Sequence, residues 1–199
     1  MALELMLLGY LIGSIPFSFL VGRARGIDLR TVGSGSLGGS NVWRALGFRY
    51  FIVAGVLDLL KGWLPVYFAQ HVLHTSALVV VGIALSAVLG HAYSIFMRFR
   101  GGKAIATTCG AILAFAPALA FGGVLVWTII YRLSGYPSVA SLTTTVVAAS
   151  AGTLVSYAGY LHPAFAAFIW LATLLVFYFH RANIRRLRQG QEIGIRPRQ

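Results

Sequence analysis

Long uncharged stretches recur along the whole chain and limit what it can fold into. A helix needs about 20 apolar residues to cross the roughly 30 Å hydrocarbon layer of a membrane. Stretches of this kind lie at 5–22, 50–69, 76–97, 104–131, 138–160 and 164–179. Only 10% of the residues are charged, against roughly a quarter in soluble domains. The sequence therefore predicts an all-α, polytopic integral membrane protein.

Lysine and arginine gather in three clusters, and these clusters predict how the chain is oriented. The first consists of Arg23, Arg25, Arg30, Arg44 and Arg49, the second of Arg98, Arg100 and Lys103, and the third of Arg181, Arg185, Arg186, Arg188, Arg196 and Arg198. Short loops rich in these residues stay on the cytoplasmic side of a membrane. The excess of 16 Lys+Arg over 4 Asp+Glu is therefore interpreted as an orientation signal, and no nucleic-acid partner is expected.

The stretch 104–131 is too long for one crossing. As a single helix its 28 residues would measure about 42 Å, and one crossing there would put the arginines of the tail outside. Pro117 lies near the middle, and a turn at that proline gives two short, partly buried helices. We therefore expect seven transmembrane helices, with the amino terminus outside and the carboxyl terminus in the cytoplasm. We also expect one membrane-embedded domain, 1–199, with a frayed tail over 190–199.

Two glycine-rich motifs resemble nucleotide-binding loops only superficially. The first places its glycines in a GxGxxG pattern, at Gly33, Gly35 and Gly38. No strand precedes it, so a dinucleotide fold is excluded. The second, RGGKA at 100–104, has Met97 where a P-loop has its first glycine and Ala104 in place of serine or threonine. The single cysteine, Cys109, excludes a thiolate metal cluster, and we expect neither a metal nor a cofactor.

The two glycine-bearing segments, 31–47 and 100–104, nevertheless have the chemistry of an anion site. Each offers bare backbone near a predicted helix start, at Ser40-Asn41 and at Lys103, where exposed N–H groups attract anions. Arg44 and Lys103 add full positive charges. The alternative is a pair of ordinary cytoplasmic loops that use glycine for tight turns and arginine for lipid headgroups. Hydroxyl side chains, an amide and glycines are clustered beside single cations, and this combination favours a phosphate site.

Three polar residues lie within predicted spans. Asp58 and Lys61 are three positions apart on one helix and are expected to form a structural pair. His91 lies near the cytoplasmic end of its helix, close enough to the glycine-bearing segments to be a candidate site residue. At the end of the last span, His180 and Asn183 are expected at the depth of the cytoplasmic surface.

Five segments together resemble one family of membrane enzymes. They are GSGSLGGSNVWR, DLLKG, GHAYSIFMRFRGGKAIAT, SVAS and HRANIRRLRQGQE, in that order. They resemble the bacterial acyl-phosphate-dependent glycerol-3-phosphate acyltransferases, the PlsY family, and the resemblance runs from Gly13 to Glu192. It implies a seven-helix protein of the bacterial inner membrane, with its active site at the cytoplasmic face. It also implies a protein that acts as a monomer among membrane lipids and uses no acyl-CoA.

The reaction implied by the resemblance moves a fatty acyl group from acyl phosphate to the 1-hydroxyl of glycerol 3-phosphate. The products are lysophosphatidic acid (1-acyl-glycerol 3-phosphate) and phosphate, in the first step of phospholipid biosynthesis. The residues then expected to be catalytic are Ser34, Arg44, His91, Lys103 and Asn183. Those expected to bind substrate are Gly33, Gly35, Ser36, Gly38, Ser40, Asn41, Gly101, Gly102, Thr107, Ser141 and His180.

The chain also departs from the usual family pattern. It has Ser36, Gly39, Ser40, Ala104 and Pro137 where Asn, Ala, Thr, Gly and an aliphatic residue are usual. Ser40 keeps the hydroxyl of threonine, whereas Ser36 lacks the amide. A paralogue that acylates another acceptor is therefore an alternative. A small transporter for an anionic metabolite or a lipid-binding scaffold would also fit a polytopic protein with cationic loops, but no inverted repeat supports the transporter.

The residues limit how the reaction can proceed. Acyl-CoA-dependent acyltransferases use a histidine with an aspartate five positions on, whereas Phe96 follows His91 at that spacing. Among the acids, only Asp28 and Glu192 fall in cytoplasmic motifs, so we expect no carboxylate that orients His91.

Direct transfer between the two substrates is therefore the predicted mechanism. An acyl-enzyme at Ser34 or Ser36 has no evident base partner in the sequence. We expect Lys103, Arg44 and the loop amides to hold two phosphates side by side and to stabilise the developing charge. A donor phosphate oxygen can then remove the hydroxyl proton. His91 is expected to orient a phosphate or the hydroxyl, with general base as its alternative role.

Overall fold

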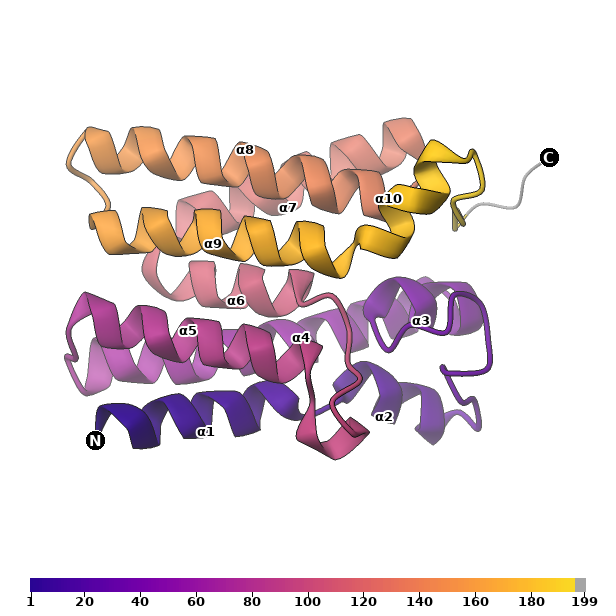
Figure 1. Ribbon diagram of the computed structural model, residues 1–199, viewed down its shortest axis with the longest axis horizontal. Helices are drawn as coiled ribbons and strands as arrows, with labels where there is room; N and C mark the ends of the chain where they lie inside the picture. Colours follow the sequence, from indigo (N-terminus) through magenta and orange to yellow (C-terminus); the bar gives the residue numbers. More distant parts are fainter. Residues whose placement is uncertain (196–199) are drawn as a thin grey trace. The chain divides into compact units, whose positions relative to one another are not determined.

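The computed structural model describes residues 1–195, which form helices joined by loops (Figure 1). The chain divides into two compact units, Met1–Phe115 and Ala116–Gln199, which are described separately. The helices of the first unit are α1 (Ala2–Ser14), α2 (Phe17–Ala24), α3 (Gly39–Leu46), α4 (Phe48–Tyr67), the π-helical turn η1 (Phe68–Val72), α5 (Ala77–Ala92), the 3-10 turn η2 (Ile95–Met97) and α6 (Ile105–Phe115). Those of the second are α7 (Pro117–Ser134), α8 (Pro137–Tyr157), α9 (Pro163–Phe179) and α10 (Arg181–Arg188).

Five helical segments are long and apolar enough to cross a membrane, and they confirm an all-α, polytopic membrane protein. They are Ala2–Ala24, Phe48–Val72, Ala77–Met97, Pro117–Ser134 and Pro137–Tyr157. A sixth results if α9 and α10, bent by 59°, count as one span, and α6 is apolar but shorter. Large apolar side chains such as Leu78, 73% exposed, and Leu133, 80% exposed, lie on the outside of these helices. Such surfaces suit contact with lipid.

The first predicted span, 5–22, contains a break that the hydropathy pattern did not predict. Helix α1 ends at Ser14 and α2 begins at Phe17. Pro16 has no backbone N–H and disfavours the helical conformation at the residue before it, so Ile15 adopts φ −60° and ψ 118°. The segment is therefore two helices where we expected one. The break makes the Ile15 carbonyl available to a donor from another helix.

The predicted interruption of the stretch 104–131 is confirmed. Helix α6 ends at Phe115, Ala116 has φ −147° and ψ 70°, and α7 begins at Pro117. Proline at the first helical position loses no hydrogen bond, because the N–H there has no partner within the helix. The two halves belong to different units, and α7 exposes most of its surface.

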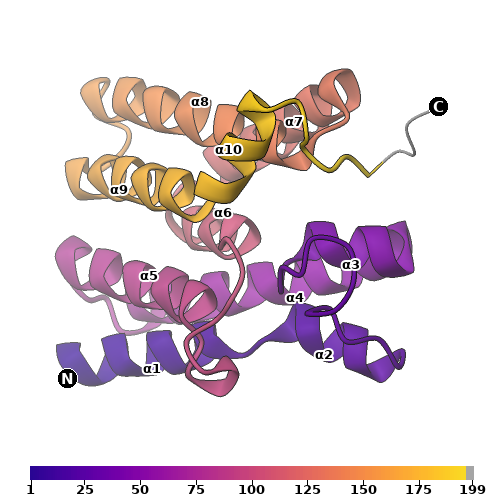
Figure 2. The ribbon, with the colours of Figure 1, turned by 45° about the vertical axis from the view of Figure 1, so that its right-hand side comes forward.

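Glycines allow helices α4 and α6 of the first unit to pack very closely. Helix α1 packs along α5, and α4 packs along α6 (Figure 2). A Cβ atom on Gly62 would overlap the Thr107 carbonyl, and one on Gly110 would overlap the Leu59 carbonyl. Small residues commonly allow this approach between helices in membranes. The contact brings the Thr107 hydroxyl to 3.0 Å from the Asp58 carbonyl oxygen.

Hydrogen bonds between helices join the second unit. They run from Trp127 Nε1 to Ser141 Oγ at 3.0 Å, from Trp170 Nε1 to Thr153 Oγ1 at 2.9 Å, and from Thr173 Oγ1 to the Thr145 carbonyl at 3.1 Å. Such bonds stabilise helix pairs where no water competes for the polar groups. Helix α10 then turns away from α9 and carries Asn183.

Candidate active site

The first glycine-bearing segment is organised around the buried side chain of Asn41. Its Oδ1 accepts the backbone N–H of Ser34 at 2.9 Å. Its Nδ2 donates to the carbonyls of Leu29 and Val32, each at 3.0 Å. Gly33 has φ 57°, and a Cβ atom there would overlap Asn41 Oδ1. The amide is therefore used within the loop, and its contact with a phosphate stays a prediction.

Helix α3 begins directly after this loop, in agreement with the predicted helix start at Ser40-Asn41. The half-buried Arg44 lies on α3, and its Nη1 donates to the Ser40 carbonyl at 3.3 Å. Ser34 and Ser36 are also half-buried. Ser40, at the start of α3, is half-buried as well, so the segment carries one cation and three half-buried hydroxyls next to a loop that Asn41 fixes in place.

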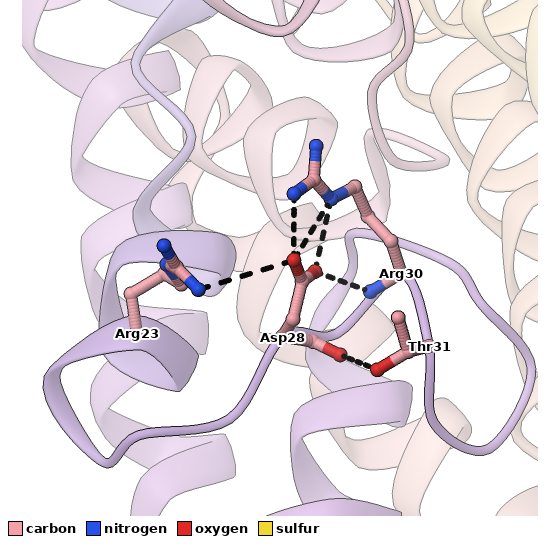
Figure 3. Close-up of polar contacts among 4 residues, drawn as sticks. All are labelled: Arg23, Asp28, Arg30 and Thr31. Atoms are coloured by element: carbon pink, nitrogen blue, oxygen red, sulfur yellow. Dashed lines mark hydrogen bonds and ion pairs between the residues drawn. The ribbon is translucent and has the colours of Figure 1, made fainter.

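An acidic residue anchors the entrance to the same loop, as Figure 3 shows. Arg30 donates to the Asp28 carboxylate through Nη2 at 2.6 Å, and Arg23 Nη1 lies 4.0 Å away on the other side. The Asp28 carbonyl accepts the Thr31 hydroxyl at 3.0 Å. Hydrogen bonds from Arg30, together with its charge, lower the pKa of Asp28 to about 2. Both guanidinium groups also lie over the Phe19 ring, at 5.8 Å and 5.3 Å from its centroid.

The second glycine-bearing segment lies directly on His91. The Gly102 N–H donates to the His91 carbonyl at 3.2 Å. A Cβ atom on Gly101 would overlap that carbonyl, and one on Gly102 would overlap His91 Nε2. Lys103 follows and is half-buried. Ala104, where the family usually has glycine, has φ 58°, so it holds the left-handed conformation that favours glycine.

Three ionisable side chains are buried next to this segment. Lys61 Nζ lies 2.9 Å from Asp58 Oδ1 and donates to the Ile15 carbonyl at 2.6 Å. Ser18 Oγ donates to Asp58 Oδ2 at 2.7 Å. The predicted Asp58–Lys61 pair is therefore present. Asp58 Oδ1 is also 3.7 Å from His91 Nδ1, so the expectation that no carboxylate approaches His91 was wrong.

Thr107 links the same residues and is fully buried. Its Oγ1 lies 3.0 Å from the Asp58 carbonyl and 3.0 Å from His91 Nδ1. The hydroxyl is therefore used within the protein, which differs from the predicted contact between Thr107 and substrate.

A small pocket opens at this buried group. Its lining includes Leu37, Asp58, Lys61, His91, Gly101 and Gly102. Leu37 belongs to the first glycine-bearing segment and the two glycines belong to the second. The two segments therefore meet at one pocket of the first unit. The lysine in this lining, Lys61, is paired with Asp58, whereas Arg44 and Lys103 lie on the two segments outside the lining.

The predicted residues of the second unit are buried within it. Ser141 Oγ accepts the Trp127 indole N–H. His180 Nδ1 lies 2.8 Å from the Val176 carbonyl. Because a carbonyl oxygen can only accept, Nδ1 is the nitrogen assigned the proton.

The Glu192 side chain holds the tail against the rest of the second unit through hydrogen bonds. It is 5% exposed and accepts hydrogen bonds from Asn183 Nδ2 at 2.5 Å, Ser138 Oγ at 2.8 Å and Arg186 Nε at 2.9 Å. Burial acts to raise the pKa of Glu192, but these hydrogen bonds and the Arg186 charge outweigh it and lower the pKa. The tail is anchored at this residue, where we expected fraying. Arg196 and Arg198 lie outside the described residues.

Comparison with known proteins identifies the family. A sequence profile for glycerol-3-phosphate acyltransferase matches residues 3–190. The chain belongs to this family. The glycerol-3-phosphate acyltransferase of Roseiflexus sp. (strain RS-1) is 47% identical to it over 191 residues, 96% of this chain and 94% of that protein. The glycerol-3-phosphate acyltransferase of Aquifex aeolicus (strain VF5) is 41% identical over 192 residues, 96% and 97% of the two chains.

Two crystal structures of PlsY, an integral membrane glycerol 3-phosphate acyltransferase, have the same fold as this acyltransferase. The glycerol 3-phosphate form has a TM-score of 0.88 and 39% identity, over 97% of this chain and 94% of that chain. The lysophosphatidic acid form has a TM-score of 0.87 and 37% identity over the same shares. The resemblance found in the sequence motifs is thus confirmed.

Two residues of this acyltransferase have positions that sequence reasoning missed. Asp58 approaches His91 from a different helix, and Glu192 receives three side chains of the second unit. A signal existed for Asp58, because a charged residue within a membrane span is by default a functional candidate. Glu192 lies within a motif that supports the family resemblance, but its partners could not be inferred from spacing.

Proposed function

We propose that the protein transfers a fatty acyl group from acyl phosphate to the 1-hydroxyl of glycerol 3-phosphate, as the first step of phospholipid biosynthesis. One observation carries this proposal: the fold and 39% of the sequence are shared with PlsY in its glycerol 3-phosphate form, over 97% of this chain. The products are lysophosphatidic acid and phosphate. The meeting of both glycine-bearing segments at one pocket supports a site for phosphorylated substrates.

The first unit supplies the groups that bind phosphate. Arg44 lies on α3 next to a loop held by Asn41, and Lys103 follows glycines that rest on His91. Guanidinium and ammonium groups stabilise both a bound phosphate and the charge that develops on a leaving phosphate. The N–H groups of Ser34 and Gly102 are used by Asn41 and by the His91 carbonyl, so in this proposal other backbone N–H groups of the two segments add dipoles without bulky side chains.

The chemistry needs no covalent intermediate with the protein. The 1-hydroxyl oxygen attacks the carbonyl carbon of acyl phosphate and forms the ester C–O bond. The C–O bond to phosphate then breaks and phosphate leaves, while the hydroxyl proton passes to a phosphate oxygen. The second pKa of a phosphate monoester is about 6, so such an oxygen can accept a proton near neutrality. Ser34 then acts by hydrogen bonding, and positioning supplies most of the rate.

The remaining site residues belong to the same proposal. His91 lines the pocket and orients the acceptor hydroxyl, which can donate a hydrogen bond to a ring nitrogen. In the second unit, Ser141, His180 and Asn183 contact substrate.

We also propose that the protein lies in a bacterial inner membrane and acts there as a monomer among lipids. In this arrangement α6 and α7 each cross the membrane, which gives seven crossings, an outside amino terminus and a cytoplasmic active site. The placement of the three arginine clusters supports this orientation. Light scattering of the protein in detergent would measure the oligomeric state.

The function is tested by measuring phosphate release and lysophosphatidic acid formation by purified protein given acyl phosphate and glycerol 3-phosphate. Neither metal nor CoA is added. Arg44→Ala and Lys103→Ala are expected to lower kcat/KM at least about 100-fold, as expected for lost charge-assisted contacts in a transition state. Arg49→Ala and Arg100→Ala, which remove exposed arginines near each site, are the matched controls. Absence of product with the unaltered protein would contradict the proposal.

A further inference from the structure

The mechanism proposed above makes no use of Asp58 and Lys61, although both are almost completely buried. Asp58 is 2% exposed and Lys61 is 3% exposed, on a helix that is apolar enough to span the membrane. Charged residues are costly to bury in such positions, and they are rare there. Two leucines in these places would avoid that cost, so the pair calls for a role beyond packing.

Every partner of this pair is placed by a specific break or close approach of helices. Lys61 reaches the Ile15 carbonyl, which Pro16 removes from the regular helix. Asp58 receives Ser18 from the start of α2. Helices α1, α2 and α4 thus meet at the pair. The Asp58 carboxylate also faces His91, whose Nδ1 lies 3.7 Å from Asp58 Oδ1.

The contacts of Thr107 assign the tautomer of His91. The Thr107 hydroxyl has a single hydrogen, and the Asp58 carbonyl at 3.0 Å can only accept it. The 3.0 Å contact between Thr107 Oγ1 and His91 Nδ1 is then donated by His91. The Asp58 carboxylate on the same side of the ring also favours a proton on Nδ1. His91 Nε2 is left as an acceptor on the opposite side of the ring.

The opposite side of the ring is where the second glycine-bearing segment lies. Gly102 is so close that a Cβ atom would overlap His91 Nε2, and its N–H donates to the His91 carbonyl. The His91 ring thus packs against Gly102, the residue before Lys103, so the position of the ring and the course of this segment are linked.

We propose that Asp58, Lys61 and Thr107 form a positioning group that holds His91 with Nδ1 protonated, and that His91 in turn holds the Gly101–Gly102 backbone for phosphate binding. This inference rests on the proposed function and extends it to residues that touch no substrate. Asp58 and Thr107 act on the ring, and Lys61 holds the Asp58 carboxylate in place through the 2.9 Å contact between its Nζ and Asp58 Oδ1. The group is built from α4 and α6, whose close packing over Gly62 and Gly110 brings it together.

The kinetic test compares two neighbouring threonines. Thr107→Val removes the acceptor for His91 and is expected to raise KM for a phosphorylated substrate about tenfold, the effect of one lost hydrogen bond, with a smaller change in kcat. Thr107→Ser restores the hydroxyl and is expected to recover most of that loss. Thr108→Val is the matched control, because the Thr108 hydroxyl is also buried but has no hydrogen-bond partner among residues 1–195. Equal effects of Thr107→Val and Thr108→Val would overturn the proposal.

A double-mutant cycle separates action through His91 from a general structural role. In a His91→Gln background, Thr107→Val is expected to change KM less than about twofold, since its target is already absent. A further tenfold rise in that background would overturn the proposal. Asp58→Asn leaves Lys61 buried without its carboxylate, so this variant can fail to fold. The pair variant Asp58→Asn/Lys61→Met removes both charges and keeps the bulk, and it is expected to fold with the same KM defect.

The tautomer itself is measured independently of activity by nitrogen-15 NMR of histidine-labelled protein in lipid. His91, identified by the signal that His91→Gln removes, is expected to be neutral with the proton on Nδ1. Thr107→Val and Asp58→Asn/Lys61→Met are expected to shift it toward the other tautomer. A proton on Nε2 in the unaltered protein would overturn the inference, even if the enzyme makes lysophosphatidic acid. Absence of that product with an Nδ1 proton present would contradict the proposed function alone.

Discussion

Ala104 occupies a backbone conformation that suits glycine. Its φ of 58° lies in the left-handed region, which costs a residue with a Cβ atom roughly 1–2 kcal/mol. Ala104 joins Lys103 to the first turn of α6. The backbone conformation of Ala104 therefore sets the direction of the chain between the second glycine-bearing segment and α6. The family usually has glycine here, and this chain maintains the same turn at a cost.

Replacing this alanine is expected to stabilise the protein. Ala104→Gly removes the strain but makes the unfolded chain more flexible, which opposes the gain by about 0.4–1 kcal/mol. A net increase of about 0.5–1 kcal/mol in the free energy of unfolding is expected, measured by thermal unfolding in detergent. Ala106→Gly, in the first turn of α6, is the control and is expected to destabilise by about 0.5–1 kcal/mol. A lower melting temperature for both variants would show that Ala104 is unstrained.

Asn41 determines whether the first glycine-bearing segment keeps its shape. Asn41→Ala leaves the Leu29 and Val32 carbonyls and the Ser34 N–H without their partner, at a cost of about 1–3 kcal/mol. We expect a higher KM for phosphorylated substrates and a lower melting temperature. Asn41→Asp keeps the acceptor for Ser34 but sets a carboxylate oxygen against two carbonyls, and it is expected to be equally damaging. An unchanged KM in both variants would show that the loop does not depend on this amide.

These residues also mark how far a sequence predicts a site. The composition of the two segments predicts that phosphate chemistry happens there, because few other functions need glycine, hydroxyl, amide and cation together. Composition cannot tell which polar groups are already used within the protein. Asn41 and Thr107 have the same chemistry as a ligand-binding residue, but their hydrogen bonds are taken by neighbours that only the folded chain supplies.

The two prolines that interrupt apolar stretches differ in how well they can be predicted. The stretch that contains Pro117 exceeds the thickness of a membrane, so its length alone requires a break. The stretch that contains Pro16 has the right length for one helix, so hydropathy gives no sign of a break. The break at Pro16 is nevertheless the one that supplies a carbonyl to Lys61.

Removing Pro16 should therefore weaken the buried pair. Pro16→Ala allows α1 and α2 to join, and the Ile15 carbonyl can then bond within the helix and leave Lys61. A loss of about 1.5–3 kcal/mol is expected, the contribution of one hydrogen bond made by a charged group. Pro163→Ala is the matched control, because Pro163 stands at the first position of α9 and its replacement is expected to change stability by less than about 1 kcal/mol. Equal melting temperatures of the two variants would contradict this role for the break.

The tail is held by one carboxylate, so its attachment should depend on pH. Glu192 has a lowered pKa, and a group of this kind stabilises the folded state above its unfolded pKa and loses that contribution as pH falls through the folded value. The protection of residues 181–195 from hydrogen exchange, relative to the rate of an unfolded chain at the same pH, is expected to be high at neutral pH and to fall below about pH 4.3, the ordinary glutamate value. Glu192→Gln should exchange quickly at every pH. A Glu192→Gln tail that remains protected would show that the charge is unnecessary.

Charge and hydropathy together predict the orientation of the chain. The side of the membrane on which Tyr160 lies distinguishes one crossing from two in the stretch 104–131. If that stretch crosses twice, Tyr160, 86% exposed between α8 and α9, faces outside; if it crosses once, Tyr160 faces the cytoplasm. Two crossings keep all three arginine clusters inside, which the positive-inside rule favours. Tyr160→Cys in a Cys109→Ser background is therefore expected to react with a membrane-impermeant maleimide in intact cells.

Two reference positions calibrate that measurement. His74→Cys, between η1 and α5, is expected to react in intact cells as well, and Arg25→Cys, between α2 and α3, only after the cells are opened. These two positions are on opposite sides of the membrane whether the stretch crosses once or twice, so they report whether the reagent has stayed outside. Protection of Tyr160→Cys alongside reactive His74→Cys would place the arginines of α10 outside, and the seven-crossing arrangement would have to be abandoned.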